Sequence, residues 1–292
     1  MSPTLLRAFH LVAQAGSFTR AARAGGVSQP TLSAQVRALE AAHGVSLFNR
    51  HGRKVTLTPL GQNLLAITTR LFAAEDEASA LLAGARTLTR GHLRIAADSA
   101  THVMPLLAAL RQRHGGLTFS LRIGNSSDVI ELVLGYEADI GVTAKPTSDP
   151  RLHSIPIRID RLVLFVPAAH PWARQRRIGI RLLQGADLVI RERGSITREV
   201  FEARLAEAGI RPRTLVEVQT REAVREAVAA GFGIGIVFAS ELGDDPTLRP
   251  VEVTDAVLTV AEYMICREDR RRLPLVRSLL DLAQPAAPTP AA

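Results

Sequence analysis

A long helical segment without a strong internal break divides this chain into two parts. Its apolar residues recur in alternating steps of four and three, and this 3.5-residue period lasts for about four heptads. The residues are Leu60, Leu64, Ile67, Leu71, Ala74, Ala78, Leu81, Ala85 and Leu88. Such a seam favours a partner helix for residues 59–89. The alternative is a single helix that packs on its own domain.

Residues 1–58 carry the pattern of a winged helix-turn-helix. A first amphipathic helix stops at Gly16, and Ser17 is a suitable N-cap for a second helix from Phe18 to about residue 24. Gly25 and Gly26 form a turn, and Ser28 can cap a third helix with polar residues in its first turn. Two short strands, 47–48 and 55–57, then flank a basic hairpin over 49–54, which has the composition of a wing.

The charge of the chain is concentrated in this head. Residues 1–60 contain seven basic residues and one acidic residue, Glu40, and so contribute +6 of the net +8. This asymmetry is typical of a protein that binds a polyanion, although a solvated basic face is the alternative. The partner predicted is double-stranded DNA, and the residues expected to contact it are Ser17, Thr19, Ser28, Gln29, Pro30, Thr31, Ser33, Arg37, Arg50, Arg53 and Lys54.

Several classes of protein are excluded by the composition. The one cysteine, Cys266, cannot form an intramolecular disulfide, which favours a cytoplasmic location. No apolar run approaches the ~20 residues that span a bilayer, so no membrane association is expected. No histidine pair has metal-ligand spacing, and G-x-S-x-G is absent, so we expect no metal, cofactor or enzymatic activity. Gly231, Gly233 and Gly235 follow a helix and precede a strand, which is the wrong order for a nucleotide loop.

Residues 90–285 have the alternation of an α/β domain, and 286–292 are predicted to be a disordered tail. Short apolar runs alternate with amphipathic segments, which indicates a mostly parallel sheet with helices on its faces. The predicted strands are 93–96, 117–123, 139–143, 161–166, 188–190, 215–218 and 234–238. The predicted helices are 102–114, 126–136, 196–208 and 221–230.

Polar residues follow the carboxyl ends of these strands, where open α/β sheets bind their ligands. They are Ser99, Thr101, Asn125, Ser126, Thr143, Arg193, Ser195, Thr197, Thr220 and Arg221. Hydroxyl groups at helix starts are more often helix caps than ligand contacts, so the hypothesis depends on their convergence. Together with the two arginines they predict a small anionic or zwitterionic effector. An ammonium group on it would need an acceptor, for which Glu222 and Asp98 are candidates.

The head resembles the LysR family of transcriptional regulators. The resemblance is carried by Gly16-Ser17-Phe18-Thr19-Arg20-Ala21-Ala22, Val27-Ser28-Gln29-Pro30-Thr31-Leu32-Ser33, Leu47-Phe48-Asn49-Arg50 and Leu57-Thr58-Pro59-Leu60-Gly61. Ala34 and Pro59 depart from the commonest pattern of the family. The resemblance implies an α/β effector domain of two subdomains around a cleft, like a periplasmic binding protein, with crossings near Asp160 and Arg267. It also implies that residues 59–89 are a linker helix that joins copies of the chain into a homo-oligomer, a dimer or a tetramer. The regulator implied is one whose effector changes how dimers pair and how RNA polymerase reaches the promoter.

Three stretches resemble, more narrowly, LysR regulators associated with 2-aminoethylphosphonate catabolism. They are Arg122–Ser126, Gly194–Glu199 and Thr220–Gly231. Since this fold also serves transport-type binding proteins and enzymes, the alternative is that the second half has one of those activities. The attached DNA-binding head argues against that alternative.

Overall fold

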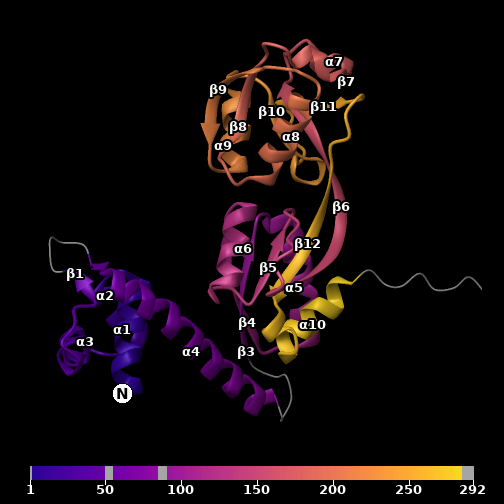
Figure 1. The fold of residues 1–292 in the computed structure, drawn as a ribbon. Helices are drawn as coiled ribbons and strands as arrows, with labels where there is room; N and C mark the ends of the chain where they lie inside the picture. The colour runs from indigo at the N-terminus through magenta and orange to yellow at the C-terminus, as the bar shows by residue number, and fades with distance from the viewer. Residues whose placement is uncertain (1, 50–54, 85–90, 285–292) are drawn as a thin grey trace, which may run out of the picture. The chain divides into compact units, whose positions relative to one another are not determined.

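The computed structural model describes residues 2–49, 55–84 and 91–284 (Figure 1). The chain forms two compact units, Met1–Arg86 and Thr87–Ala292, which are described separately below. The centre of the predicted wing, the end of the predicted linker and the predicted tail lie outside the described residues.

Three helices build the head: α1 (Pro3–Ala15), α2 (Phe18–Gly25) and α3 (Gln29–His43). Each of the last two begins where the sequence predicts, because Ser17 accepts a hydrogen bond from the Arg20 N–H at 3.4 Å and Ser28 from the Thr31 N–H at 3.2 Å. Gly26 takes a left-handed φ of 64° between α2 and α3, a conformation that glycine adopts at little cost. The two short strands β1 (Phe48–Asn49) and β2 (Thr56–Leu57) pair antiparallel, as expected for a wing.

The long helix α4 (Pro59–Gly84) has two apolar faces, of which one is buried and the other is largely exposed. Thr68, Phe72 and Ala73 are buried, and Phe72 belongs to the core that α1 and α3 form. The seam residues behave differently: Leu60 is 47% exposed, Ile67 52% and Leu71 45%. One residue of the predicted repeat, Leu64, packs partly against this core, so most but not all of the repeat lies away from the face that packs on the head.

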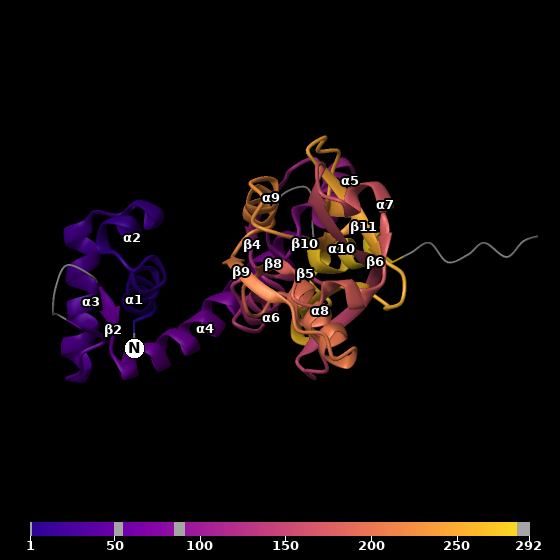
Figure 2. The ribbon, with the colours of Figure 1, turned by 90° about the horizontal axis from the view of Figure 1, so that it is seen from above.

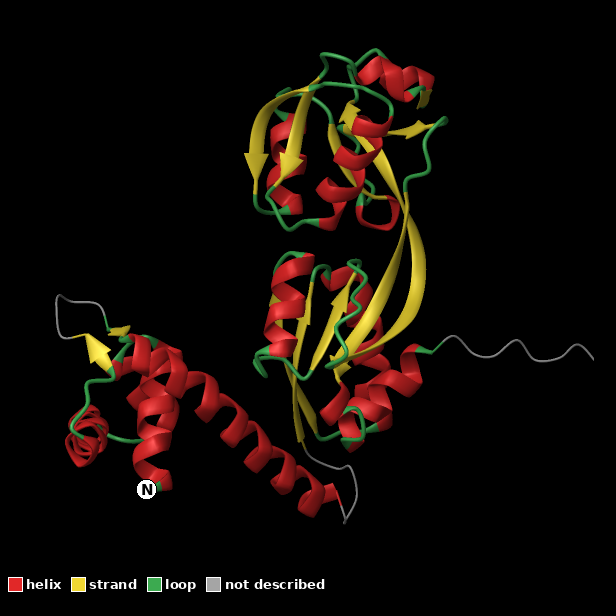
Figure 3. Ribbon diagram, viewed as in Figure 1, coloured by secondary structure: helices red, strands yellow, loops and turns green. Residues whose placement is uncertain are grey.

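The second unit consists of two α/β subdomains (Figure 3). In the first, β3 (Gly91–Ala97) lies between β4 (Leu117–Ile123) and β5 (Ile140–Thr143), all parallel. Its helices are α5 (Ala100–Arg113), α6 (Ser126–Leu134) and α10 (Pro274–Ala283). The second contains β7 (Arg177–Ile178), β8 (Asp187–Arg191), β9 (Arg213–Val218), β10 (Gly235–Phe238) and β11 (Leu248–Val253), with α7 (Trp172–Gln175), α8 (Ile196–Glu207) and α9 (Arg221–Ala229).

Two long antiparallel strands, β6 (Leu152–Pro167) and β12 (Thr259–Arg267), run through both subdomains (Figure 3). The first crossing lies near Asp160, as predicted. The predicted return near Arg267 is wrong, because Asp160 pairs with Val260, and Arg267 pairs with Leu152 deep in the first subdomain. A register irregularity between Glu262 and Tyr263 marks the crossing segment of β12. The predicted parallel sheet thus holds within each subdomain, while the crossover strands are antiparallel.

The three glycines after α9, Gly231, Gly233 and Gly235, allow a sharp turn and close packing of the next strand. Gly231 has a φ of 85° at the helix end, and a Cβ on Gly235 would lie 2.4 Å from the Phe165 ring. A Cβ on Gly233 would lie 2.4 Å from the Asp187 carbonyl oxygen. The motif therefore lets a strand approach its neighbours closely, as its order in the sequence indicates.

Across the described part of the chain, no helix has the length and apolar character needed to cross a membrane.

Candidate functional site

The first turn of α3 presents the residues predicted to read DNA. Gln29, Pro30 and Thr31 are exposed, whereas Ser33 is half-buried. The hydroxyl groups of Ser28 and Thr31 lie 2.7 Å apart, so each is partly engaged by the other. Gln29 makes no such contact within the described residues and is the freest side chain for a base edge. Thr19 on α2 is also exposed, while Ser17 is half-buried and caps its helix.

The surface of the head is more basic than the count of charges indicates. Glu40, its one acidic residue before α4, is buried and accepts hydrogen bonds from the Leu47 N–H at 2.7 Å and the Phe48 N–H at 3.3 Å. The exposed Arg20, Arg23 and Arg37 form no ion pair within residues 2–49 and 55–84. They are therefore available for phosphates. Arg50, Arg53 and Lys54 lie outside the described residues.

A cavity of about 630 Å³ lies in the second unit. Its walls come from the starts of α5, α6 and α9, the end of β8 and the short turn after β10; Figure 2 shows these elements from above. The lining residues used below are Ser99, Thr101, Asn125, Asp128, Arg191, Glu192, Thr220, Arg221, Glu222, Arg225 and Glu241.

The predicted effector residues fall into two groups. Five of them line the cavity: Ser99, Thr101, Asn125, Thr220 and Arg221. Ser126, Thr143, Ser195 and Thr197 are buried and do not line it. The Ser126 hydroxyl donates to Asp98 at 2.6 Å, and the Thr143 hydroxyl accepts from the Lys145 N–H at 3.2 Å, so these two hydroxyls hold the backbone beneath the cavity. Arg193 is exposed and lies outside the lining, because β8 ends one residue later than predicted and Arg191 takes the inward position.

The three helix starts at the cavity differ in how their N–H groups are satisfied. Asn125 accepts from the Ser127 and Asp128 N–H groups, and Thr220 accepts from the Ala223 N–H. Ser99, the N-cap of α5, makes no side-chain capping bond. The first-turn N–H groups of α5 are thus the ones left available to an anionic group.

The arginines of the lining are already paired. Arg191 donates two hydrogen bonds to Glu192, at 2.7 and 2.9 Å. Arg221 Nε lies 2.7 Å from a Glu241 oxygen, and its Nη1 donates to the Asp98 carbonyl. Arg225 pairs with Asp245 at 3.3 Å, outside the lining. Sequence reasoning missed Arg191, Glu192 and Glu241, although Glu241 follows the strand ending at Phe238 almost directly and the same positional rule would have found it.

Behind Glu241 lies a buried cluster that joins the two subdomains. His102 on α5 contacts Glu262 on β12 through Nδ1, and its Nε2 lies 2.9 Å from the Ser240 hydroxyl. Ser240 in turn donates to Asp160 on β6. Burial raises the pKa of Glu241, while the neighbouring Arg221, Ser99 and His102 oppose that rise. The crossing strands are therefore tied to a helix of one subdomain and a turn of the other.

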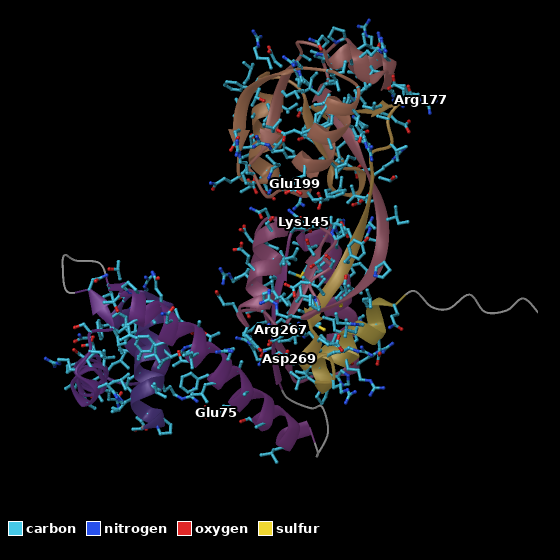
Figure 4. The ribbon with its side chains drawn as sticks, in the orientation of Figure 1. Glu75, Lys145, Arg177, Glu199, Arg267 and Asp269 are labelled. Atoms are coloured by element: carbon cyan, nitrogen blue, oxygen red, sulfur yellow. The ribbon has the colours of Figure 1, made fainter. Side chains whose placement is uncertain are left out.

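A second bridge spans the two subdomains on the surface. Lys145, after β5, donates to Glu199 on α8 at 2.8 Å, and the two side chains face each other in Figure 4. Close by, the Ser127 N–H donates to the Gly194 carbonyl at 3.4 Å. Ser127 lies between the lining residues Asn125 and Asp128, so the second of these contacts lies beside the cavity.

Cys266 does not contribute a reactive thiol to this site. The residue is buried in the first subdomain, and burial raises the pKa of its thiol to about 12. Because the thiolate is the reactive form, this cysteine is inert in the folded protein.

Comparison with known proteins agrees with this division of the chain. The family described as "LysR substrate binding domain" matches residues 86–288, and "Bacterial regulatory helix-turn-helix protein, lysR family" matches residues 3–62. The chain is 30% identical over 278 residues to the transcriptional activator CmpR of a Synechocystis strain, covering 94% of this chain and 91% of that protein. It is 31% identical over 252 residues to the regulator CysL of Bacillus subtilis, covering 85% and 84%.

Solved structures show the same fold. Full-length OxyR from Pseudomonas aeruginosa, in a variant form, superposes with a TM-score of 0.75 at 24% identity over 98% of this chain and 96% of that chain. Full-length CbnR in complex with its target DNA gives a TM-score of 0.72 at 25% identity, covering 97% and 99%. Both family matches and the curated relatives, which are named as regulators and not as enzymes, lead to one identification: this chain is a DNA-binding transcriptional regulator of the LysR family.

Proposed function

We propose that this regulator binds a two-fold operator as a homodimer or a pair of dimers, and that a small effector in the cavity changes that binding. The exposed seam on α4 carries the first half of the proposal. Leu60, Ile67 and Leu71 lie at heptad spacing and remain half exposed, and an apolar stripe of this spacing is stabilised by a partner helix. A second copy of α4 is the occupant that fits it, because a two-fold dimer places two α3 helices on successive major grooves.

The cavity supports the second half. It gathers an uncapped helix start, hydroxyl groups and charged side chains between two subdomains that only β6 and β12 connect by strand. A ligand that contacts both walls favours the closed arrangement, and so shifts a conformational equilibrium within the chain.

The chemistry of the lining fits a small anionic or zwitterionic effector. The solved regulatory domain of Synechocystis CcmR in complex with 2-PG superposes with a TM-score of 0.61 at 23% identity, covering 66% of this chain and 96% of that chain. The narrower resemblance makes 2-aminoethylphosphonate the first compound to test. The proposed outcome of binding is a changed spacing of the DNA-binding heads, which alters access of RNA polymerase to the promoter in the bacterial cytoplasm.

Selection from a pool of randomised duplexes tests the DNA half of this proposal. The full-length protein should enrich sites with two related half-sites, spaced by one helical turn of about 10 bp or a multiple of it. The variant Leu71→Glu, which places a carboxylate in the seam, should enrich single half-sites or none. Enrichment of unpaired half-sites by the wild-type protein would contradict the dimeric account.

A further inference from the structure

We infer that the effector carries a cationic nitrogen, held by the carboxylates of Asp128 and Glu222, in addition to any anionic group. The inference rests on the proposed function, because it concerns the ligand of the same cavity. It begins with the balance of charges in the lining, which contains three arginines and four carboxylates: Arg191, Arg221 and Arg225 against Asp128, Glu192, Glu222 and Glu241.

None of the three arginines is a free receptor for an anion. Arg191 is held by the adjacent Glu192 in a two-bond pair, with side-chain exposures of 6% and 16%. Arg221 lies between Glu241 and the Asp98 carbonyl, and Arg225 pairs with Asp245. Lys145, near the same cleft, is paired with Glu199. An effector with negative charge alone would therefore have to break an existing ion pair to gain a cation.

Two carboxylates of the lining differ from the arginines, because they are not paired. Within residues 91–284, neither Asp128 nor Glu222 forms an ion pair. One Asp128 oxygen accepts from the Asn125 N–H in the capping box of α6, which leaves its other oxygen without such a bond. Glu222 is exposed at the first turn of α9 and lines the cavity. The unpaired charge that faces an incoming ligand is negative.

A buried carboxylate strengthens this polarity. The side chain of Glu241 is 4% exposed and lines the cavity, and Asp98, 2% exposed, lies directly before the first turn of α5 with Oδ1 lacking a hydrogen-bond partner in the described residues. Glu241 is already paired with Arg221, so Asp98 is the one of the two that adds negative potential from beneath, which favours a positive group in the cavity. The uncapped start of α5 remains the place for an anionic group, so the two ends of the ligand are recognised by different walls.

The predicted ligand class is thus a small amine that also carries an acid group. A carboxylate hydrogen-bonded to an ammonium group is a charge-assisted contact, which is stronger than a neutral hydrogen bond. Removal of the amine should cost about tenfold or more in affinity, since about 1.4 kcal/mol corresponds to a factor of ten.

Calorimetric titration of the full-length protein with matched pairs of compounds tests the inference. The pairs are 2-aminoethylphosphonate with ethylphosphonate, β-alanine with propionate, and taurine with ethanesulfonate, so that each pair differs in the amine. At least one amine should bind, and its amine-free counterpart should bind about tenfold more weakly or not at all. Glu222→Gln should reduce this ratio several-fold. Glu226→Gln, one turn further along α9, exposed and outside the lining, should leave the ratio unchanged.

The other outcomes are equally informative. An amine-free acid that binds as tightly as its amine counterpart would overturn the inference, and it would leave an effector-responsive regulator intact. Failure of all three amines to bind would overturn it as well. In either case, the selection from randomised duplexes is a separate test, and its result decides whether the protein binds DNA as the proposed dimer.

Discussion

Single side chains decide how this regulator distinguishes DNA sequences from DNA in general. Gln29 stands exposed in the first turn of α3, while Ser28 and Thr31 are partly engaged with each other. A glutamine can form two hydrogen bonds with adenine in the major groove, whereas a basic residue of the predicted wing is expected to contact phosphates, which every sequence shares. Specific recognition and general affinity are therefore separable by mutation.

Gln29→Ala should reduce binding to the selected operator by roughly 1–3 kcal/mol and leave binding to a scrambled duplex almost unchanged. Arg53→Ala, in the predicted wing, should weaken both and lower the salt dependence by about one unit of slope. Fluorescence anisotropy on both duplexes at several salt concentrations measures these effects. Equal loss on the two duplexes for Gln29→Ala would remove this residue from base recognition.

A buried histidine makes the contact between α1 and α4 sensitive to acid. Burial lowers the pKa of His10 from 6.5 to about 4, with a smaller effect of Arg7, and its Nδ1 lies 3.0 Å from the Thr68 hydroxyl. The unfolded chain takes up a proton before the folded one does. The contribution of His10 to the free energy of unfolding is therefore fully present above pH 6.5. It is lost as the pH decreases towards 4, by at most about 1.4 kcal/mol per pH unit.

His10→Gln should flatten this dependence in helical melting followed by circular dichroism, while His43→Gln, at the exposed end of α3, should not. A wild-type melting temperature that stays constant over that pH range would contradict the assignment.

At the scale of elements, the proposed dimer depends on α4. Its inner face packs on the core of the head, and most of its described seam residues are exposed. Leu71→Glu should convert the protein to a monomer and weaken binding to a two-half-site operator by about a hundredfold or more, because one of two half-sites is lost. Gln62→Glu adds the same charge nine residues earlier, two and a half turns away and so on the opposite side. Mass photometry distinguishes the two variants, and a dimeric Leu71→Glu protein would exclude the seam.

Some of the strands and cavity residues can be predicted from the sequence, and others cannot. β3, β4, β5, β8, β9 and β10 are predictable because each is a short apolar run bounded by turn residues. Only the second half of β6 is predicted, at 161–166, and neither β7 nor β11 is. β12 was not predicted, since it contains Glu262 and Tyr263, and its burial arises only when it pairs with β6 across both subdomains. For the cavity, hydroxyls at helix starts were predictable from position. Glu192 and Glu241 also follow strand ends, so the same rule would have found them, but only the fold shows that they pair with Arg191 and Arg221.

For the whole molecule, the proposed effector acts at the crossing of the two subdomains. His102 contacts Glu262, which is fully buried, and Arg158 is 3.9 Å from the other Glu262 oxygen. His102→Ala would leave a buried carboxylate without its main partner and should cost about 3–5 kcal/mol of stability. His153→Ala, also on a crossing strand but partly exposed, should cost less than about 1 kcal/mol.

Urea unfolding followed by the fluorescence of Trp172, the one tryptophan of the chain, reports on this unit alone. Equal effects of the two histidine variants would show that the buried cluster contributes no more than a surface contact.

A ligand in the cavity should change how the DNA-binding heads contact the operator. Hydroxyl-radical footprinting of the full-length protein on its selected operator, with and without saturating concentrations of the compound that binds most tightly, tests it most directly. With the ligand bound, the protected region should shift or shorten by several base pairs, and strong cleavage at a bend should weaken or move. Identical footprints in the presence and absence of a saturating ligand would contradict the account.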